Sequence, residues 1–220
     1  MAFRIVIGDV TIGIQGQDFA YIFSVGMGGM ESLYKDGKEW LYRAPRPAFW
    51  RAATDNDRGN GFVFRSAVWS AADRFVRCVK VTARMDEQEI SMPPAPENNK
   101  YSGDETCDRF EISYTYETPT VPVTEVTVSY LVESDGRIHV QVDYLGKQGL
   151  PELPVLGLRF LMPTAAEGYT YEGLSGETYP DRMAGGIHGV YEVQGLPVTP
   201  YMVPQDCGMH MQTKWLEIVR

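Results

Sequence analysis

The sequence predicts an all-β protein, a large antiparallel β-sandwich with one short helix. Three observations favour this fold class. Apolar and polar residues alternate in one segment after another, as in strands that bury one face. Two Asp-Gly pairs separate such segments, and this dipeptide readily adopts the positive φ angles of a tight hairpin turn. Only one stretch carries apolar residues at helical spacing.

The strands are expected in a chain of hairpins. Asp36-Gly37 would turn the chain between the segments MESLY and KEWLY, and Asp135-Gly136 between VTVSYLV and RIHVQVDY. Later strands are expected in VLGLRFLM and GVYEV. A further strand is expected in RFEISYTYE, which precedes the second hairpin. In this strand and the two strands of that hairpin, the residues predicted to face inward are Phe110, Ile112, Tyr114, Tyr116, Val126, Val128, Tyr130, Val132, Ile138, Val140, Val142 and Tyr144.

One helix is expected over residues 64–75, FRSAVWSAADRF, because its apolar residues recur at helical spacing. The length of 220 residues suits one large all-β domain covering residues 1–220. The last segment, MHMQTKWLEIVR, still alternates like a strand at Arg220, whereas domains usually end with a polar tail or a completed strand. We therefore expect this domain to be incomplete at its C-terminus.

Composition and charge exclude several classes of protein. With 44% hydrophobic and 22% charged residues, the chain can bury a core. The formal charge of −9 disfavours nucleic acid and anionic membranes as partners. Cys78, Cys107 and Cys207 are odd in number and lack C-x-x-C spacing, which favours a reducing, cytoplasmic setting. We find neither a secretory signal nor an apolar run that could span a bilayer.

The segment 47–62, PAFWRAATDNDRGNGF, is the strongest candidate for a site. It does not fit a calcium-binding loop, because the sixth position from Asp55 is Asn60 and the twelfth is Ser66, where glycine and glutamate are required. Asp55 and Asp57 could form an acid/base pair. Aspartates this close in a turn more often bond to nearby backbone amides, so we favour a capped corner paired with arginine.

Other candidate residues carry weaker signals. Cys207 and His210 are too few for a closed zinc site, and we expect no metal in this chain. His139 lies on the polar face of its strand, and His188 is expected in the glycine-rich loop AGGIHG. No phosphate loop, dinucleotide fingerprint or G-x-S-x-G motif is found. These motifs alone therefore disclose no reaction.

Two long segments resemble the small-chain domain of bacterial β-galactosidases of glycoside hydrolase family 2. WLYRAPRPAFWRAATDNDRGNGF is similar to that family's pattern of an aromatic residue followed by R-A-x-x-D-N-D-x-G. GLSGETYPDRMAGGIHGVYEVQGLPVTPYMVPQDCGMHMQTKW is similar to its YPDR, TPY and P-Q-x-x-G segment. The resemblance covers nearly the whole chain. It is strongest to the separately encoded small subunit of heterodimeric enzymes.

The resemblance implies a supersandwich like that of galactose mutarotases and a part in the retaining hydrolysis of terminal β-galactosides such as lactose. Retention requires two carboxylates about 5–5.5 Å apart. In the family both carboxylates lie on a TIM-barrel domain that this chain lacks, so the chain alone is expected to be inactive. The resemblance also implies that the magnesium and sodium ions of the active site are bound by the large subunit, which would be the partner, with the galactoside in a shared pocket.

The resemblance also suggests roles for residues of both motifs. In the family, the glycine matching Gly59 begins a mobile loop, although the sequence after it departs from the family's longer loop here. We expect Arg182 to pair bidentately with a carboxylate or with carbonyls. The corner expected to face the large subunit and the substrate pocket is Asp55, Asn56, Asp57, Arg58 and Gly59, and the residues expected to be structural are Trp50, Arg51, Tyr179, Pro180, Asp181 and Arg182.

Two alternative functions remain open from the sequence. The same sandwich occurs in stand-alone carbohydrate-binding modules, because a fold does not determine a function. A mutarotase-like aldose epimerase would need a pair of histidines and a glutamate in one groove. The spacing of His139, His188 and His210 does not support that arrangement.

Overall fold

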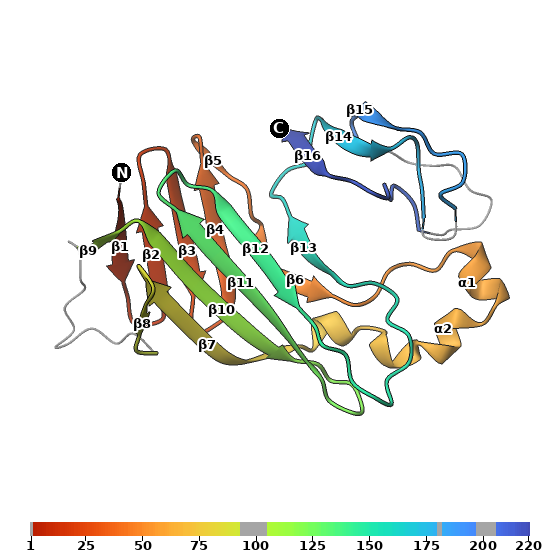
Figure 1. Ribbon diagram of the computed structural model, residues 1–220, viewed down its shortest axis with the longest axis horizontal. Helices are drawn as coiled ribbons and strands as arrows, with labels where there is room; N and C mark the ends of the chain where they lie inside the picture. The colour runs from red at the N-terminus through yellow and green to blue at the C-terminus, as the bar shows by residue number, and fades with distance from the viewer. Residues whose placement is uncertain (1, 93–104, 180–181, 197–205) are drawn as a thin grey trace. The chain divides into compact units, whose positions relative to one another are not determined.

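The computed structural model describes residues 2–92, 105–179, 182–196 and 206–220 (Figure 1). The chain divides into two compact units. The larger unit comprises Met1–Trp50 and Arg65–Pro163, and the smaller unit comprises Arg51–Phe64 and Thr164–Arg220. The single domain predicted over residues 1–220 stays a prediction.

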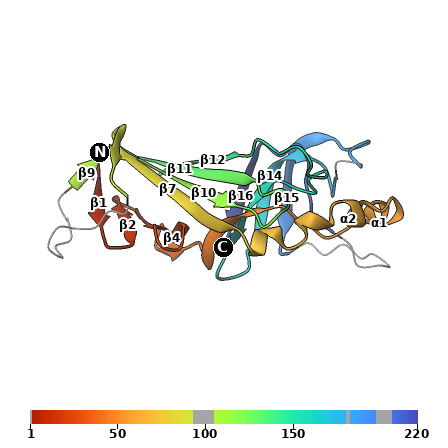
Figure 2. The ribbon, with the colours of Figure 1, turned by 90° about the horizontal axis from the view of Figure 1, so that it is seen from below.

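The larger unit contains two antiparallel sheets and a separate strand pair. One sheet has the order β5-β4-β3-β2-β1-β9, the other β12-β11-β10-β7-β8, and β13 pairs with β6. Figure 2 shows β7, β10, β11 and β12 in one layer and β1, β2 and β4 in another. The strands are β1 (Phe3–Ile7), β2 (Thr11–Gln15), β3 (Phe19–Ser24), β4 (Gly29–Lys35), β5 (Lys38–Glu39), β6 (Arg43–Ala48), β7 (Arg77–Met85), β8 (Gln88–Ile90), β9 (Glu105–Cys107), β10 (Arg109–Glu117), β11 (Glu125–Glu133), β12 (Ile138–Asp143) and β13 (Gly157–Leu161).

Aromatic side chains from both layers form the core of the larger unit. The ring of Phe23 on β3 lies 5.8 Å from that of Phe110 on β10 and 5.7 Å from that of Tyr130 on β11, measured between centroids. All inward-facing residues predicted on β10 and β11 are at most 1% exposed. These contacts confirm the predicted all-β sandwich, since burying the apolar face of each sheet against the other is what holds such a fold together.

Both predicted hairpin turns are present. Asp36 and Gly37 have φ angles of 52° and 78°, the two positive values that a type I′ turn requires. Gly136, with φ of 80°, turns the chain between β11 and β12. Of the inward-facing residues predicted from Ile138 onward, Ile138, Val142 and Tyr144 are partly buried and pack against the core. Val140, on the edge strand β12, is 42% exposed, so the prediction is wrong for this residue.

The single helix predicted over residues 64–75 is wrong. The chain instead forms α2 (Phe62–Arg65) and two 3-10 turns, η1 (Ala67–Trp69) and η2 (Ala72–Arg74), preceded by α1 (Asp55–Gly59). Ala71 interrupts the run with a left-handed φ of 62°. Phe64 and Phe75, expected on the buried face, are exposed. No helix of the described residues is long and apolar enough to cross a bilayer.

Trp69 explains why the helix is broken. Its side chain is fully buried beside Phe49 and Tyr144, and its indole Nε1 donates a hydrogen bond of 3.2 Å to the Pro151 carbonyl. Ser66 Oγ donates to the Glu152 carbonyl at 2.9 Å. Contacts with this distant segment orient the short turns, and tertiary contacts of this kind override the spacing of apolar residues.

The smaller unit contains the antiparallel sheet β15-β14-β16. Its strands are β14 (Gly168–Leu174), β15 (His188–Gln194) and β16 (Trp215–Val219). The predicted strand GVYEV lies within β15, and the alternating terminal segment forms β16. His188 is the first residue of β15 and pairs with Leu174, so the loop predicted for it is wrong.

Candidate functional site

The R-A-x-x-D-N-D-x-G motif forms a capped corner of the smaller unit. Thr54 is the N-cap of α1, and its side chain accepts a hydrogen bond from the Asp57 amide at 3.2 Å. In return, Asp57 Oδ2 accepts from the Thr54 amide at 2.8 Å. This reciprocal pair is a capping box, which satisfies two backbone donors that the start of a helix leaves free. The spacing of Thr54 and Asp57 therefore explains why the chain turns here.

Asp57 is the anchor of the corner. Arg51 donates to both of its carboxylate oxygens, at 2.5 Å from Nη1 and 3.2 Å from Nη2. The two side chains are 17% and 13% exposed. Burial by itself would raise the pKa of Asp57, but the hydrogen bonds from Arg51 and Thr54 hold that pKa below its ordinary value. The capped, arginine-paired corner predicted from the sequence is confirmed.

The side chains beside Asp57 lie on the surface. Arg58 Nη1 donates to Asp55 Oδ1 at 3.0 Å, in a pair that is largely exposed to solvent. Asn56 is also exposed. The corner thus turns one carboxylate inward and presents an amide and an ion pair outward.

Gly59 is the last residue of α1, and its backbone does not need glycine. Its φ is not positive, and a Cβ at this position would meet nothing within 4 Å. Gly61, with φ of 73°, is the residue of this segment that occupies the left-handed region. The mobile loop that the resemblance implies at Gly59 stays a prediction.

Asp206 brings a second carboxylate into the surroundings of Arg51. Its amide donates to the Ala53 carbonyl at 3.4 Å, which ties the P-Q-x-x-G segment to the corner. Burial raises the pKa of Asp206, and the negative charges of Asp57 and Glu177 add to this effect, whereas Arg51 opposes it. The Arg51 guanidinium therefore acts on the pKa of both Asp57 and Asp206, and it is hydrogen-bonded to Asp57.

Asp206 was not singled out from the sequence. It lies within the P-Q-x-x-G motif, at a position that the motif leaves variable, so the motif itself gave no reason to choose it. Its proximity to Arg51 depends on the contact between two segments about 150 residues apart. Asp206 could have been found only by asking which acidic residue of the second motif lies near Arg51 of the first.

The second predicted structural corner is described in part, since Pro180 and Asp181 lie outside the described residues. Tyr179 is buried, and the Arg182 guanidinium lies 4.5 Å from the centroid of its ring. The Arg182 amide donates to the Tyr179 carbonyl at 2.8 Å. Among the described residues the Arg182 guanidinium makes a cation–π contact, and the bidentate pairing expected for it stays a prediction.

His210 belongs to an aromatic cluster of the smaller unit. Its Nδ1 lies 2.8 Å from the Gly176 carbonyl and its Nε2 lies 2.8 Å from the Tyr169 hydroxyl. Because a carbonyl only accepts, Nδ1 donates to Gly176, and in the neutral imidazole Nε2 then accepts from the Tyr169 hydroxyl. The imidazole also lies against Tyr171, with centroids 4.1 Å apart. Both ring nitrogens are therefore engaged in contacts within the smaller unit.

The remaining sequence candidates are dispersed. His139 Nε2 lies 3.2 Å from Glu133 Oε2 on the exposed side of β12, as expected for a solvated histidine. Cys207 is exposed, and all three cysteines are free thiols. Across the described ranges, the structure holds no group of three or more His, Cys, Asp or Glu side chains that could bind a metal ion.

Trp50 and Arg51 mark the passage from the larger to the smaller unit. Trp50 packs against the core of the larger unit, and its carbonyl accepts a hydrogen bond of 3.3 Å from Arg159. Arg51 pairs with Asp57 within the smaller unit, and the structural role predicted for it stays a prediction.

The family model described as β-galactosidase small chain matches residues 15–220. The chain belongs to the β-galactosidase small-chain family. The match includes both motifs and the capped corner. In this member of the family, the R-A-x-x-D-N-D-x-G motif folds around the Arg51–Asp57 pair.

Similar proteins agree with this assignment. A protein of Latilactobacillus sakei named β-galactosidase small subunit is 60% identical over 98% of the small chain described here, which spans 68% of that relative. β-Galactosidases of Clostridium acetobutylicum and Streptococcus thermophilus are 39% and 32% identical over 86% and 96% of the chain. The chain spans only 19% of the length of each of these two enzymes.

Proposed function

We propose that this chain is the non-catalytic small subunit of a cytoplasmic β-galactosidase and completes the active-site pocket of a large subunit. The observation that carries the proposal is the 60% identity, over 98% of the chain, to the relative named β-galactosidase small subunit. The assembled enzyme would hydrolyse terminal β-galactosides such as lactose. The magnesium and sodium ions implied by the family would be held by the large subunit.

The geometry of the corner supports a non-catalytic role for its aspartates. A retaining glycosidase needs one carboxylate free to attack and one free to transfer a proton. Both oxygens of Asp57 accept hydrogen bonds from Arg51, and one also accepts from Thr54. Both oxygens of this carboxylate are thus engaged in holding the corner together, which disfavours a role for Asp57 as nucleophile or proton donor. The reacting acids are therefore assigned to the large subunit.

The corner would act by positioning. The capping box and the Arg51–Asp57 pair hold α1 rigid before any partner binds. The outward-facing Asp55, Asn56 and Arg58 then offer a prearranged set of polar groups to the pocket. Prearranged groups lose little conformational freedom on assembly, so more of their interaction energy remains for binding and orientation.

Reconstitution tests this function. The purified chain is mixed with a β-galactosidase large subunit, and hydrolysis of a chromogenic galactoside is followed for each chain alone and for the mixture. Activity only in the mixture is the expected result. Cleavage by the lone chain that is lost in Asp55→Asn would overturn the proposal. Saturable galactose binding by the lone chain would favour a carbohydrate-binding module, and anomer interconversion would favour an epimerase.

A double variant tests the corner itself. Asp55→Asn with Arg58→Gln removes an exposed ion pair, which contributes at most about 1 kcal/mol to stability. We expect the variant to keep its Tm and to lower the activity of the mixture. If the mixture with the variant is as active as the mixture with the unaltered chain, the subunit assignment stands but the corner does not face the pocket.

A further inference from the structure

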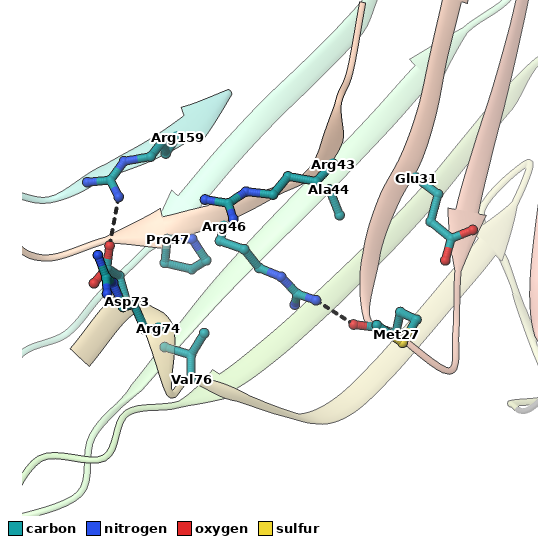
Figure 3. Close-up of a pocket in the computed structure, with 10 residues that line it drawn as sticks. All are labelled: Met27, Glu31, Arg43, Ala44, Arg46, Pro47, Asp73, Arg74, Val76 and Arg159. Atoms are coloured by element: carbon teal, nitrogen blue, oxygen red, sulfur yellow. Dashed lines mark hydrogen bonds and ion pairs between the residues drawn. The ribbon is translucent and has the colours of Figure 1, made fainter. Parts of the chain in front are cut away.

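A basic groove lies in the larger unit, and all the residues that line it belong to that unit. It encloses about 670 Å³ and is formed by β4, β6, η2 and β13 (Figure 3). Four arginines and two acidic residues line it, namely Arg43, Arg46, Arg74, Arg159, Glu31 and Asp73. The groove thus carries an excess of positive charge on a chain whose formal charge is −9.

Two of the arginines are committed to the fold. Arg46 donates to the carbonyls of Gly28 and Met27, at 2.6 and 2.7 Å, and its guanidinium lies 5.5 Å from the centroid of the Tyr116 ring. Arg159 donates to Asp73 at 2.9 Å and to the Trp50 carbonyl at 3.3 Å. Asp73 is therefore neutralised by a partner that the fold provides.

Arg43 and Arg74 differ from Arg46 and Arg159 in their contacts. Both are exposed, and within the described part of the chain neither guanidinium has a hydrogen bond or an ion pair. The remaining carboxylate of the groove, Glu31, forms no ion pair with a described residue either. In Figure 3 the Arg43 side chain extends over β6 between Arg159 and Arg46. Like charges gathered in this way repel one another unless an anion lies between them.

We propose that the groove is a binding site for an oxyanion, a carboxylate or a phosphate group, with Arg43 and Arg74 as its ligands. A guanidinium offers a planar fork of donors that matches two oxygens of such a group. The guanidinium groups of Arg43 and Arg74 together fit a ligand that carries at least two anionic groups. Arg159, held by Asp73, adds positive potential beside them, and Pro47 and Val76 supply apolar wall. This site does not depend on the proposed enzymatic function.

Calorimetry of the full 220-residue chain at low ionic strength tests the site, with inorganic pyrophosphate and citrate as probes. We expect saturable binding of at least one probe and a loss of affinity of tenfold or more in the double variant Arg43→Gln/Arg74→Gln. Added salt should weaken binding, because the charges lie at the surface. A polyglutamate peptide is the third probe. If the peptide binds more tightly than pyrophosphate and citrate, the source of the oxyanion is an acidic protein segment. If pyrophosphate or citrate binds more tightly than the peptide, the source is a free anion.

The matched control is Arg84→Gln, which removes the same charge from an exposed position on β7 that lines a different pocket with Glu87 and Glu111. It should bind the probes as the unaltered chain does. The thermal unfolding of both variants should match that of the parent, because the side chains of Arg43 and Arg74 form no hydrogen bond or ion pair with the described residues and their backbone contacts are unchanged by the substitutions. No saturable binding of any probe, or equal affinity in the double variant, would overturn the proposal.

Discussion

Asp57 and Asp206 show how the surroundings of a residue decide what a carboxylate does. Both feel the positive charge of Arg51, yet the pKa of Asp57 is lowered and that of Asp206 is raised. Asp57 receives hydrogen bonds from Arg51 and Thr54 that outweigh its burial. Asp206 has burial as the main influence on its pKa, with the charges of Asp57 and Glu177 adding to it. The same residue type therefore stabilises the fold at one position and opposes it at the other.

Opposite effects on stability follow for the two amide variants. Asp57→Asn removes the buried ion pair with Arg51 and should lower the free energy of unfolding at pH 7 by about 2 kcal/mol. Asp206→Asn removes a carboxylate whose ionised form is disfavoured in the folded state, and should raise that free energy slightly. Urea unfolding of the three proteins at one pH measures both effects.

The pH dependence provides the control. The pKa of Asp57 is lowered from 3.8 on folding, so its contribution is present above that value and is lost as pH falls through the folded pKa. The pKa of Asp206 is raised from 3.8, so the gain in its variant should disappear below that value. Two variants that change stability in the same direction at pH 7 would contradict this account.

Two buried tyrosines on neighbouring strands form a second matched pair. Tyr116 on β10 donates its hydroxyl hydrogen to the Gly28 carbonyl at 3.0 Å, whereas the Tyr130 hydroxyl on β11 has no hydrogen-bond partner among the described residues. Tyr116→Phe should cost about 1 kcal/mol of unfolding free energy. Tyr130→Phe should leave it unchanged or raise it, because phenylalanine removes a buried polar atom. Chemical denaturation checks both, and a larger loss in Tyr130→Phe would contradict the assignment.

At the scale of elements, residues 62–75 show a conflict between spacing and packing. The segment has helical spacing of apolar residues and several alanines, which favour helix. Burial of Trp69 and the hydrogen bonds of Trp69 and Ser66 to residues 151 and 152 require a bent path instead. Ala71 takes the left-handed conformation that allows the bend. Left-handed backbone costs an alanine about 1–2 kcal/mol.

Ala71→Gly is therefore expected to stabilise the protein. Glycine adopts a φ of 62° without a Cβ clash, and the gain, after its larger loss of chain entropy, should be about 0.5–1 kcal/mol. The Tm from differential scanning calorimetry measures it. Ala67→Gly, placed in η1 without a positive φ, is the control and should be destabilising. A loss of stability in Ala71→Gly would mean that the segment is a regular helix in solution.

For the whole molecule, burial is unevenly distributed between the units. β10 and β11 of the larger unit alternate between fully buried and partly exposed residues along their whole length. The strand β16 of the smaller unit has no buried residue and lies at the edge of its sheet. Local opening costs least where few apolar contacts must be broken. The two units should therefore differ in the stability of their backbone hydrogen bonds.

Hydrogen exchange followed by mass spectrometry measures this difference. Peptides covering residues 109–117 and 125–133 should be the slowest to exchange, and the peptide covering residues 215–219 should be among the fastest of the strands. A fast edge strand within the larger unit, such as β8, is the internal comparison. Equal protection of β16 and β10 would contradict the expectation.

Much of the fold could be predicted from local patterns. Alternation in RFEISYTYE and VTVSYLV identified β10, β11 and their buried faces, because the pleat of a strand places every second residue on one side. The Asp-Gly pairs identified two turns, because few other residues tolerate their φ angles. The exposed Val140 was not foreseen, since alternation does not reveal whether a strand lies at the edge of its sheet.

The sequence by itself determined β10 and β11, the hairpin turns, the capped corner at Asp57, and the family, all of which depend on residues close together in the chain. Tertiary structure alone decided the path of residues 62–75, the place of Asp206 beside Arg51, and which arginines of the groove have no partner among the described residues. Each of these depends on contacts between segments far apart in the chain. Local sequence carries no direct record of which distant side chains will compete for the same hydrogen bond or charge.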